Sequence, residues 1–395
     1  MKILIITPRI PYPPYRGDKL KIFNISKILS KSNSITILTF YENKNDFVNT
    51  VFLEKLGIKT IALKLSLFNS LRNLVANVFS SLPFQVAYYS SKSMGRKIIE
   101  LTSNENYDVV YFHLIRSAQY LEYVHDPKTL KVLDFTDAVS LYLYRFVEVT
   151  KNPLKKLGLK IELDRIQNYE QIALKYDTLF ICSEKDKKFL EKRKLHNNIQ
   201  FLQNGVDPIY FQKENISVEK HRIIFTGNMP YFPNQDAVEH FVKNIFPSVI
   251  KKYTDAKFYI VGQKPSRKIR NYAKENIIVT GFIQDIKKEY LLSEVNVVPI
   301  RFGAGTLNKV IEALALGVPT VATSLSVAGL PSELKKYIYL ADSPSEFLES
   351  ISQIFEDDNI RINKMKEVQE IVMNMLSWDK IVGEFENYLL SRIGK

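Results

Sequence analysis

The chain alternates short β-branched runs with helical patterns, and it does so in two successive series. The runs of the first series are KILIIT, SITILTF, DVVYFHLI, TLKVLDF and DTLFICS. A second series begins at RIIFTG, with a helix predicted over residues 236–253, and continues through KFYIVG, NIIVTG and VNVVPI to TVAT. Strands that alternate with helices form parallel sheets whose faces are covered by those helices. The sequence therefore predicts an α/β protein with two doubly wound domains in tandem and a cleft between them.

Residues 201–221 separate the two series. This stretch, FLQNGVDPIYFQKENISVEKH, combines Asn-Gly, Asp-Pro and a polar tail, which are features of turns and linkers. A chain of 395 residues is long enough for two domains of about 200 residues each. We place the first domain at residues 1–205 and the second at residues 206–377, and a C-terminal helix over residues 378–395 can pack back on the first domain.

The net charge of +13 is concentrated in the first half of the chain. Residues 1–200 contain 31 Lys and Arg against 19 Asp and Glu. Such an excess favours an anionic partner, such as anionic lipid, a phosphorylated acceptor or nucleic acid, although a solvated basic face has the same composition. Residues 64–82 place Leu and Phe at helical spacing among polar residues, a pattern shared by helices on membrane surfaces and by amphipathic core helices.

Cysteine content and hydropathy limit the cellular locations that fit the sequence. The single cysteine, Cys182, excludes an internal disulfide and a multi-cysteine metal site, and it fits a reducing cytoplasm. The first residues, MKILIITPR, lack the length and cleavage site of a signal peptide and are expected to form a strand. The sequence contains no run of about 18 apolar residues, which argues against a membrane span. We expect a cytoplasmic protein, either free or peripheral on the inner face of the cell membrane.

The second half of the chain repeatedly places glycine just after a strand. Gly227, Gly262 and Gly281 follow three successive strands, and Gly303 follows the next one. In doubly wound sheets the carboxyl ends of the strands face the crevice where ligands bind. These turns are therefore expected to line one pocket, although a glycine can also serve only to make a tight turn.

The stretch GAGTLNKVIEALALGVP, residues 303–319, suggests a phosphate site at the start of a helix over residues 308–317. Small residues let a ligand approach the backbone, and the free N–H groups of a helix start attract phosphate. Thr306 is the expected N-cap, and Lys309 lies in the first turn, where a cation opposes the helix dipole unless an anion is near. Glu312 can accept hydrogen bonds from the two hydroxyls of a ribose, or it can be a solvated partner of Lys309.

Seven stretches together carry a family resemblance. They are TPRIPYPPYRGDKLKIFNISKIL, DVVYFHLIRSAQYL, NGVDPIYF, IIFTGNMPYFPNQDAV, FYIVG, VTGFIQDI and GAGTLNKVIEALALGVPTVAT. In this order and spacing the sequence resembles glycosyltransferase family 4, retaining transferases of GT-B architecture, over nearly the whole chain. It is particularly similar to the bacterial subset with a Gly-x-Met-x-Tyr-x-Pro-Asn signature. The resemblance implies two Rossmann-like domains that face a central cleft, with the acceptor held mainly by the first and a nucleotide-diphosphate sugar mainly by the second.

Three residues are expected to be catalytic, and the resemblance supplies the roles of two of them. His113 matches the active-site histidine that ends an N-domain strand and faces the donor sugar, and Glu312 matches the glutamate that holds the ribose. Lys309 is expected to meet the charge of the diphosphate. Arg16 and Asp18, beside the glycine loop of the first domain, are candidates for acceptor contacts.

The other expected donor contacts lie in that glycine loop and in turns of the second domain. Gly281 and Phe282 match the position whose backbone reads the nucleobase in the family. The remaining donor-binding candidates are Gly17, Gly227, Asn228, Arg301, Gly303, Ala304, Gly305, Thr306, Leu307 and Asn308.

The sequence departs from the family pattern at two points. Ala304 stands where the first glutamate of the Glu-x7-Glu motif contacts the donor sugar, so that contact is expected to pass to backbone groups of residues 303–307. The Arg and Lys that neutralise the diphosphate in the family are absent from GNMPYFPNQ, residues 227–235, which leaves Lys309, Arg301 and helix amides for that role. The sequence contains no Asp-x-Asp motif, so we expect no metal requirement and no cofactor.

The expected function is retaining transfer of a hexosyl group from a UDP- or GDP-sugar to a saccharide or lipid-linked acceptor, in the synthesis of cell-surface polysaccharide or glycolipid. Retention is expected to proceed through an oxocarbenium-like sugar stabilised by the departing phosphate, which takes the acceptor's proton. A double displacement would need a carboxylate nucleophile. Asp134 and Asp137 are the nearest candidates from the first domain, and we interpret them as structural.

Three other functions fit parts of the sequence. A nucleotide-sugar epimerase of the same fold would convert a sugar nucleotide without any acceptor. A dinucleotide-dependent oxidoreductase needs Gly-x-Gly-x-x-Gly after the first strand, where TPRIPYPPYRGD stands instead. A basic membrane- or nucleic-acid-binding protein is suggested only by the charge, and without a nucleic-acid-binding motif we expect no nucleic-acid partner.

Overall fold

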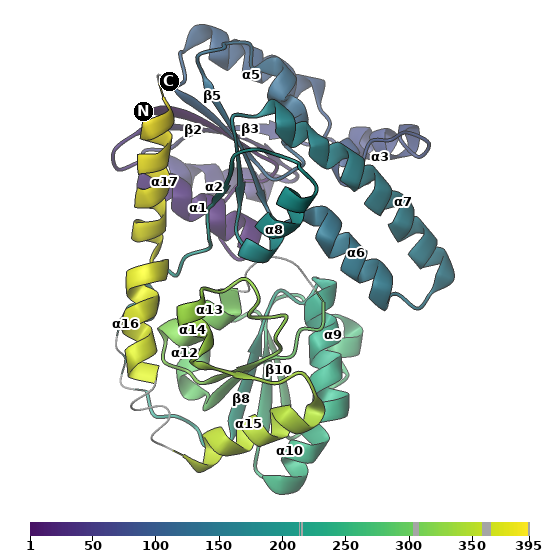
Figure 1. Cartoon of the computed structure of the whole chain (residues 1–395), viewed down its shortest axis with the longest axis vertical. Helices are drawn as coiled ribbons and strands as arrows, with labels where there is room; N and C mark the ends of the chain where they lie inside the picture. The colour runs from purple at the N-terminus through teal and green to yellow at the C-terminus, as the bar shows by residue number, and fades with distance from the viewer. Residues whose placement is uncertain (213, 215, 303–307, 358–364, 394–395) are drawn as a thin grey trace. The chain divides into compact units, whose positions relative to one another are not determined.

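The described residues divide into two units, and the chain passes between them twice. The computed structural model describes residues 1–395 except 213, 215, 303–307, 358–364 and 394–395. The first unit is formed by Met1–Gln203 together with Ile381–Lys395, and the second by Asn204–Lys380 (Figure 1). The division lies at residues 203/204, whereas the sequence places the boundary at 205/206.

The first unit contains a parallel sheet of seven strands among the described residues, in the order β3-β2-β1-β4-β5-β6-β7. Its central strands are apolar and buried on both faces, as expected for a parallel sheet covered by helices. The strands are β1 (Lys2–Thr7), β2 (Ser34–Tyr41), β3 (Lys59–Lys64), β4 (Val109–His113), β5 (Leu130–Thr136), β6 (Thr178–Ile181) and β7 (Ile199–Phe201). The helices are α1 (Gly17–Leu29), α2 (Lys44–Lys55), α3 (Leu67–Ala76), α4 (Phe84–Tyr88), α5 (Lys92–Asn104), η1 (Ala118–Tyr123), α6 (Val139–Val149), α7 (Pro153–Tyr169), η2 (Glu170–Lys175) and α8 (Glu184–Lys192).

Polar N-cap residues fix where several of these helices begin. The side chain of Ser91 accepts a hydrogen bond from the backbone N–H of Met94 at the start of α5. Asn152 does the same for Lys155 at the start of α7, with Pro153 in the first helical position. These caps satisfy N–H groups that have no partner inside the helix, and proline fits the first turn because its own N–H is missing.

The last helix, α17 (Trp378–Arg392), packs on the sheet of the first unit. The Phe385 ring lies 5.1 Å from that of Phe180 on β6 and 5.7 Å from that of Tyr111 on β4. The Tyr388 hydroxyl lies 3.0 Å from Thr178 Oγ1. The last segment of the chain thereby covers apolar surface of a sheet made almost entirely from its first half.

The second unit contains a parallel sheet of six strands among the described residues, in the order β10-β9-β8-β11-β12-β13. The strands are β8 (Arg222–Thr226), β9 (Lys257–Val261), β10 (Ile277–Gly281), β11 (Val295–Val298), β12 (Thr320–Ala322) and β13 (Ile338–Leu340). The helices are η3 (Pro208–Phe211), α9 (Phe232–His240), η4 (Phe241–Ile245), α10 (Phe246–Lys252), α11 (Arg267–Arg270), α12 (Ile286–Leu292), α13 (Asn308–Ala315), α14 (Ser332–Lys335), α15 (Pro344–Glu356) and α16 (Met365–Leu376). The predicted α/β class with two doubly wound sheets is confirmed.

The helix predicted over residues 236–253 begins earlier and is interrupted. It starts as α9 at Phe232, with a proline in the first turn, widens to a π-helical turn in η4 and continues as α10. The second proline of the segment, Pro247, lies in the first turn of α10 and has no N–H to donate to the preceding turn. The wide turn just before Pro247 is the expected consequence of that missing donor.

Both sheets have a point where the strand order reverses, and these points locate the candidate sites. In the first unit, β2 and β3 lie on one side of β1, and β4 to β7 lie on its other side. The second unit reverses in the same way between β8 and β11. Ligands of doubly wound sheets bind outside the carboxyl ends of the strands at such points. Thr7 and His113 end β1 and β4, while Thr226 ends β8 and α13 follows β11.

Candidate functional site

Lys309 lies in the first turn of α13 and turns its ammonium group toward β8. Its Nζ donates a hydrogen bond to Asn234 Oδ1 at 2.8 Å and lies 3.9 Å from the centre of the Phe225 ring. The residue is only 8% exposed. Burial lowers the pKa of Lys309 to about 7, and the nearby Glu312 carboxylate partly opposes that shift. Among the described residues the ammonium group contacts a neutral amide and an aromatic face and forms no ion pair, so it is well suited to gain an anionic partner.

Glu312 lies one turn further along α13 and is partly buried. Its Oε2 accepts a weak hydrogen bond from Tyr290 Oη at 3.4 Å, and the same hydroxyl lies 2.6 Å from Thr226 Oγ1 at the end of β8. Burial raises the pKa of Glu312 to about 7, against the opposing effects of Lys309 and Tyr290. Within the described part of the chain, Lys309 and Glu312 form no direct ion pair. Both groups therefore retain hydrogen-bonding capacity for a ligand.

Three glycine turns meet at the carboxyl edge of the same sheet. Gly227 N donates to Val261 O and Gly262 N donates to Gly281 O, each at 3.0 Å. A Cβ at Gly262, whose φ is +157°, would lie 1.8 Å from Gly227 O. A Cβ at Gly227 would lie 2.8 Å from Asn234 Cγ, and so would displace the amide that holds Lys309. The glycines thus allow a close packing of turns that fixes Asn234 beside the ammonium group.

The other donor-binding candidates of this unit already have partners. The Arg301 guanidinium is exposed and donates from Nε and Nη2 to Asp236, at 3.0 and 2.6 Å. Asn308 Oδ1 accepts a hydrogen bond from Asn204 Nδ2 at 2.9 Å. Arg301 would have to leave Asp236 to contact a diphosphate, so Lys309 is the more available cation.

Two further candidates lie in turns, and five lie outside the described residues. Asn228 O accepts a hydrogen bond from Asn234 Nδ2 at 2.9 Å. Phe282 follows Gly281 and is 51% exposed. The candidates outside the described residues are Gly303, Ala304, Gly305, Thr306 and Leu307.

His113 ends β4 at the switch point of the first unit and is 1% exposed. Its Nδ1 lies 3.0 Å from Thr7 Oγ1 at the end of β1, while its buried Nε2 has no hydrogen-bond partner among the described residues. Burial lowers the pKa of His113 to about 4, against the charges of Asp134 and Asp18. The imidazole is therefore neutral at physiological pH and can offer Nε2 to a ligand as a neutral donor or acceptor.

A buried ion pair lies beside His113. Lys21 Nζ is 2.8 Å from Asp134 Oδ2, and both side chains are fully buried. Asp134 also accepts hydrogen bonds from the Tyr111 hydroxyl and from Thr136 N. Burial alone would raise the pKa of Asp134, but Lys21 and His113 lower it below its ordinary value. These partners occupy the carboxylate, which agrees with its interpretation as a structural residue.

The loop after β1 gathers the acceptor-binding candidates. Asp18 Oδ2 accepts from Arg9 Nη1 at 3.1 Å, and Asp18 Oδ1 accepts from Arg16 Nε at 3.1 Å. Burial alone would raise the pKa of Asp18, but Arg16 and Arg9 lower it. Gly17 begins α1, and a Cβ there would meet nothing within 4 Å. The loop thus presents two guanidinium groups against one carboxylate, with open space at Gly17.

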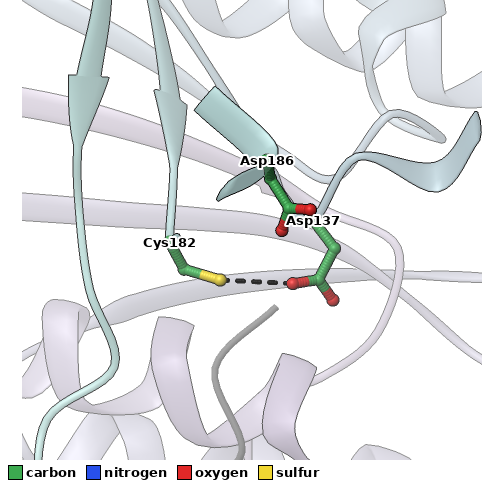
Figure 2. Close-up of side chains that lie close together, drawn as sticks. All are labelled: Asp137, Cys182 and Asp186. Carbon is green, nitrogen blue, oxygen red and sulfur yellow. Dashed lines mark hydrogen bonds between the residues drawn. The ribbon is translucent and has the colours of Figure 1, made fainter. Parts of the chain in front are cut away.

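Figure 2 shows three residues that the sequence does not connect: Asp137, Cys182 and Asp186. Their ligand atoms lie within 4.8 Å of one another, close enough to hold a cation. These groups are, however, already hydrogen-bonded within the protein. Cys182 Sγ donates to Asp137 Oδ1 at 3.2 Å, and Ser183 Oγ donates to Asp186 Oδ2 at 2.8 Å. Burial and the Asp186 charge raise the pKa of Asp137 to about 7. We interpret the cluster as a hydrogen-bond network that fixes the start of α8.

Sequence reasoning missed several residues that complete these sites. Asn234 is the last residue of the Gly-x-Met-x-Tyr-x-Pro-Asn signature, which could have indicated its role. Tyr290 and Thr7 have no comparable signal, because only the folded sheets bring them to Glu312 and His113.

A segment of the second unit is similar to a known protein family. Residues 220–357 match the model of the family Glycosyl transferases group 1. The match contains Asn234, Tyr290, Lys309 and Glu312. Over 386 residues the chain is 22% identical to an uncharacterized 44.6 kDa protein in the cps region of Klebsiella pneumoniae, with 93% of each chain covered.

Solved structures show that the fold of the whole chain is the GT-B fold. HepE of Anabaena, solved in complex with UDP and glucose, is 13% identical, with a TM-score of 0.68 over 99% of this chain and 100% of HepE. WaaG, a glycosyltransferase involved in lipopolysaccharide biosynthesis, is 13% identical, with a TM-score of 0.64 over 98% of this chain and 99% of WaaG. The chain is thus a GT-B-fold protein, and its second unit contains a segment similar to group 1 glycosyl transferases.

Proposed function

We propose that the protein is a retaining glycosyltransferase that moves a hexosyl group from a UDP- or GDP-sugar to a saccharide or lipid-linked acceptor. The observation that carries this proposal is the pair Lys309 and Glu312, held at the switch point of the unit that matches the glycosyl transferase family. A cation at the amino end of a helix suits a diphosphate, and a carboxylate one turn further suits the hydroxyls of a ribose. HepE, which shares the fold, is solved with UDP, and this favours a uridine donor.

The proposed chemistry needs charge stabilisation at the leaving diphosphate and no carboxylate nucleophile. Lys309 supplies a positive charge where the diphosphate would lie, with backbone N–H groups beside it. Asp134 is committed to Lys21, Tyr111 and Thr136, and so is unsuited to attack a sugar. We therefore propose retention through the departing phosphate, and transfer without a metal ion because protein cations meet the charge.

Each remaining residue has a proposed part in the same reaction. The neutral His113 offers Nε2 to the donor sugar, and Gly17 leaves room for the diphosphate and the acceptor. Arg16 and Asp18 contact the acceptor. The similarity to WaaG and to a protein from a cps region supports an acceptor of cell-surface polysaccharide or glycolipid synthesis. An acceptor of that kind favours a location at the inner face of the cell membrane.

The membrane relationship is peripheral in this proposal. None of the helices in the described ranges has both the length and the apolar character needed to cross a bilayer. The proposed contact with lipid is therefore made from the surface.

A donor panel tests the proposal. Purified protein is heated with each of several UDP- and GDP-sugars, and a bound donor at about 100 times its dissociation constant adds about 2.7 kcal/mol to the free energy of unfolding. The donor that stabilises is then incubated with acceptor extracts, with and without EDTA, and transfer is followed by release of the nucleoside diphosphate. We expect acceptor-dependent release that EDTA does not reduce. Conversion of the sugar nucleotide without acceptor would identify an epimerase instead.

The variant Glu312→Ala tests the site itself. We expect it to lose donor stabilisation, whereas the matched variant Glu349→Ala, which changes an exposed glutamate on α15, retains it. Wild-type donor affinity in Glu312→Ala would show that the nucleotide binds elsewhere.

A further inference from the structure

The first unit exposes apolar side chains on one face of α3. Phe68, Leu71, Val75 and Phe79 follow helical spacing along α3 and the turn after it. Phe68 is 74% exposed, Val75 is 73% exposed and Phe79 is fully exposed. A core helix buries such a face, and a solvated helix carries polar residues there. The structure therefore separates the two interpretations that the sequence of residues 64–82 leaves open, because this face lies outside the core.

The beginning of α7 repeats the same arrangement. Leu154, Leu157 and Ile161 lie three and four residues apart on one face of this helix, and Leu154 is 81% exposed. Figure 1 shows α3 and α7 extending from the sheet of the first unit.

Contacts join α7 to the turn that follows α3 and to the start of α4. The Arg165 guanidinium on α7 donates to Val78 O, just after α3. Phe84 N donates to Glu162 Oε1 on α7 at 2.9 Å, and the Phe84 ring lies 4.6 Å from the Arg165 guanidinium carbon. The exposed side chains of residues 67–79 and 154–161 therefore belong to neighbouring elements, and we name them together the α3–α7 face.

Within residues 64–82 and 151–161 every charged side chain is positive, and the acidic residues of α7 begin only at Glu162. Residues 64–82 contain Lys64 and Arg72 and no acidic residue. Residues 151–161 contain four lysines and no acidic residue. Lys151, Lys155 and Lys160 are exposed beside the apolar positions. Protruding apolar side chains surrounded by cations are the composition of helices that lie in the headgroup region of an anionic bilayer.

We propose that the α3–α7 face binds an anionic lipid bilayer, with its apolar side chains inserted among the acyl chains and its lysines among the headgroups. A second copy of the chain fits less well, because the same cations would face one another across the contact. A protein groove would have to match separate exposed side chains on two helices, whereas a fluid bilayer accommodates them in any arrangement. The face would hold the enzyme beside a lipid-linked acceptor, and to that extent its role rests on the proposed function, although lipid binding itself does not.

Vesicle flotation without donor or acceptor tests the surface separately from catalysis. The full chain is mixed with vesicles of phosphatidylcholine, with and without phosphatidylglycerol, and centrifuged through a density gradient. We expect the protein to float with the anionic vesicles and to remain below the neutral ones, with flotation reduced at high salt. Equal distribution in both gradients would overturn the proposal while leaving the donor panel unaffected.

Two variants with matched controls test which residues bind. Phe68→Asp/Phe79→Asp is expected to weaken partition at least about tenfold, whereas Val48→Asp/Leu390→Asp, which adds the same charge at exposed positions of the same unit, is not. All four positions are exposed, so we expect unchanged melting temperatures and unchanged UDP binding.

The second pair of variants removes charge without touching apolar residues. Lys151→Gln/Lys155→Gln/Lys160→Gln should lose binding to anionic vesicles. The control removes the same number of cations from exposed positions elsewhere in the first unit, with glutamine at Lys128, Lys175 and Lys192. An equal loss of vesicle binding in this control would show that net charge alone explains the effect, and it would overturn the assignment of binding to the α3–α7 face. A dimer in sedimentation that Phe68→Asp/Phe79→Asp abolishes would likewise assign the face to a second copy.

Discussion

Replacing Lys309 by methionine is expected to stabilise the free protein and to weaken its binding of a nucleoside diphosphate. The pKa of Lys309 is about 7 in the folded protein, against 10.5 for an ordinary lysine. With about 1.4 kcal/mol per pKa unit, burial of this amine costs about 4 kcal/mol at pH 7 relative to the unfolded chain. Methionine removes that cost and keeps an apolar stem over the Phe225 ring, but it leaves Asn234 Oδ1 without a donor, which costs about 1–3 kcal/mol. The net stabilisation is about 2 kcal/mol, or about 4–8 °C in Tm for a unit of this size.

The stabilisation has a pH dependence of known sign. The folded-state pKa of Lys309 is depressed, so the unfolded chain binds more protons than the folded chain between pH 7 and 10.5. Wild-type stability therefore rises with pH across this window. The methionine variant lacks the rise, and its advantage is expected to shrink by about 3 kcal/mol between pH 7 and pH 9.5.

Thermal unfolding at both pH values, with and without UDP, measures all three effects. Loss of a charged hydrogen bond to phosphate is worth about 1.5–3 kcal/mol, so UDP affinity should fall about tenfold to 100-fold. The control Lys251→Met changes an exposed lysine of the same unit and should alter neither quantity. A variant that melts at or below the wild-type temperature at pH 7, or that keeps its UDP affinity, would refute the reasoning.

Three further predictions concern the glycine turns and the first unit. Gly262→Ala should lower Tm markedly, because its Cβ would lie 1.8 Å from Gly227 O, and an unchanged melting curve would contradict the close packing of these turns. Lys21→Met leaves Asp134 charged and buried without its cation, so we expect a loss of about 3–5 kcal/mol in chemical denaturation; a loss below about 1 kcal/mol, the value of an exposed pair, would argue against the buried pair. Because the pKa of His113 is about 4, the pH profile of turnover should have no inflection from this residue between pH 5 and 8. A wild-type inflection near pH 6.5 that disappears in His113→Gln would show that the imidazole is charged in that range.

The sequence predicts the strands that form clear apolar runs, but it does not predict β3, β7 or β13, which are partly exposed or only three residues long. The runs KILIIT, SITILTF and RIIFTG correspond to β1, β2 and β8. No single apolar run determines the order of the strands in its sheet, because that order depends on which face of the sheet each connecting helix crosses. For the same reason the sequence does not show that Thr7 and His113 meet at one switch point.

The sequence likewise predicts only part of the candidate site. Lys309 and Glu312 are three residues apart on one helix, so the sequence places them together. Asn234, which is 75 positions before Lys309 in the sequence, accepts its hydrogen bond, and Tyr290 contacts Glu312 from α12. The sequence also treats Arg301 as a cation for the diphosphate, but cannot show that Asp236 neutralises it.

The return of α17 to the first unit has a consequence for how the protein is made on the ribosome. Residues 204–380 form a continuous insertion, so the second unit can fold as soon as its own residues have emerged. The first unit is interrupted by that insertion, and the surface around Phe180 and Tyr111 waits for Phe385 until translation has almost ended. The half of the protein that is synthesised first is therefore completed last. A nascent chain halted before α17 would expose the apolar surface around Phe180 and Tyr111, which is a binding surface for a chaperone.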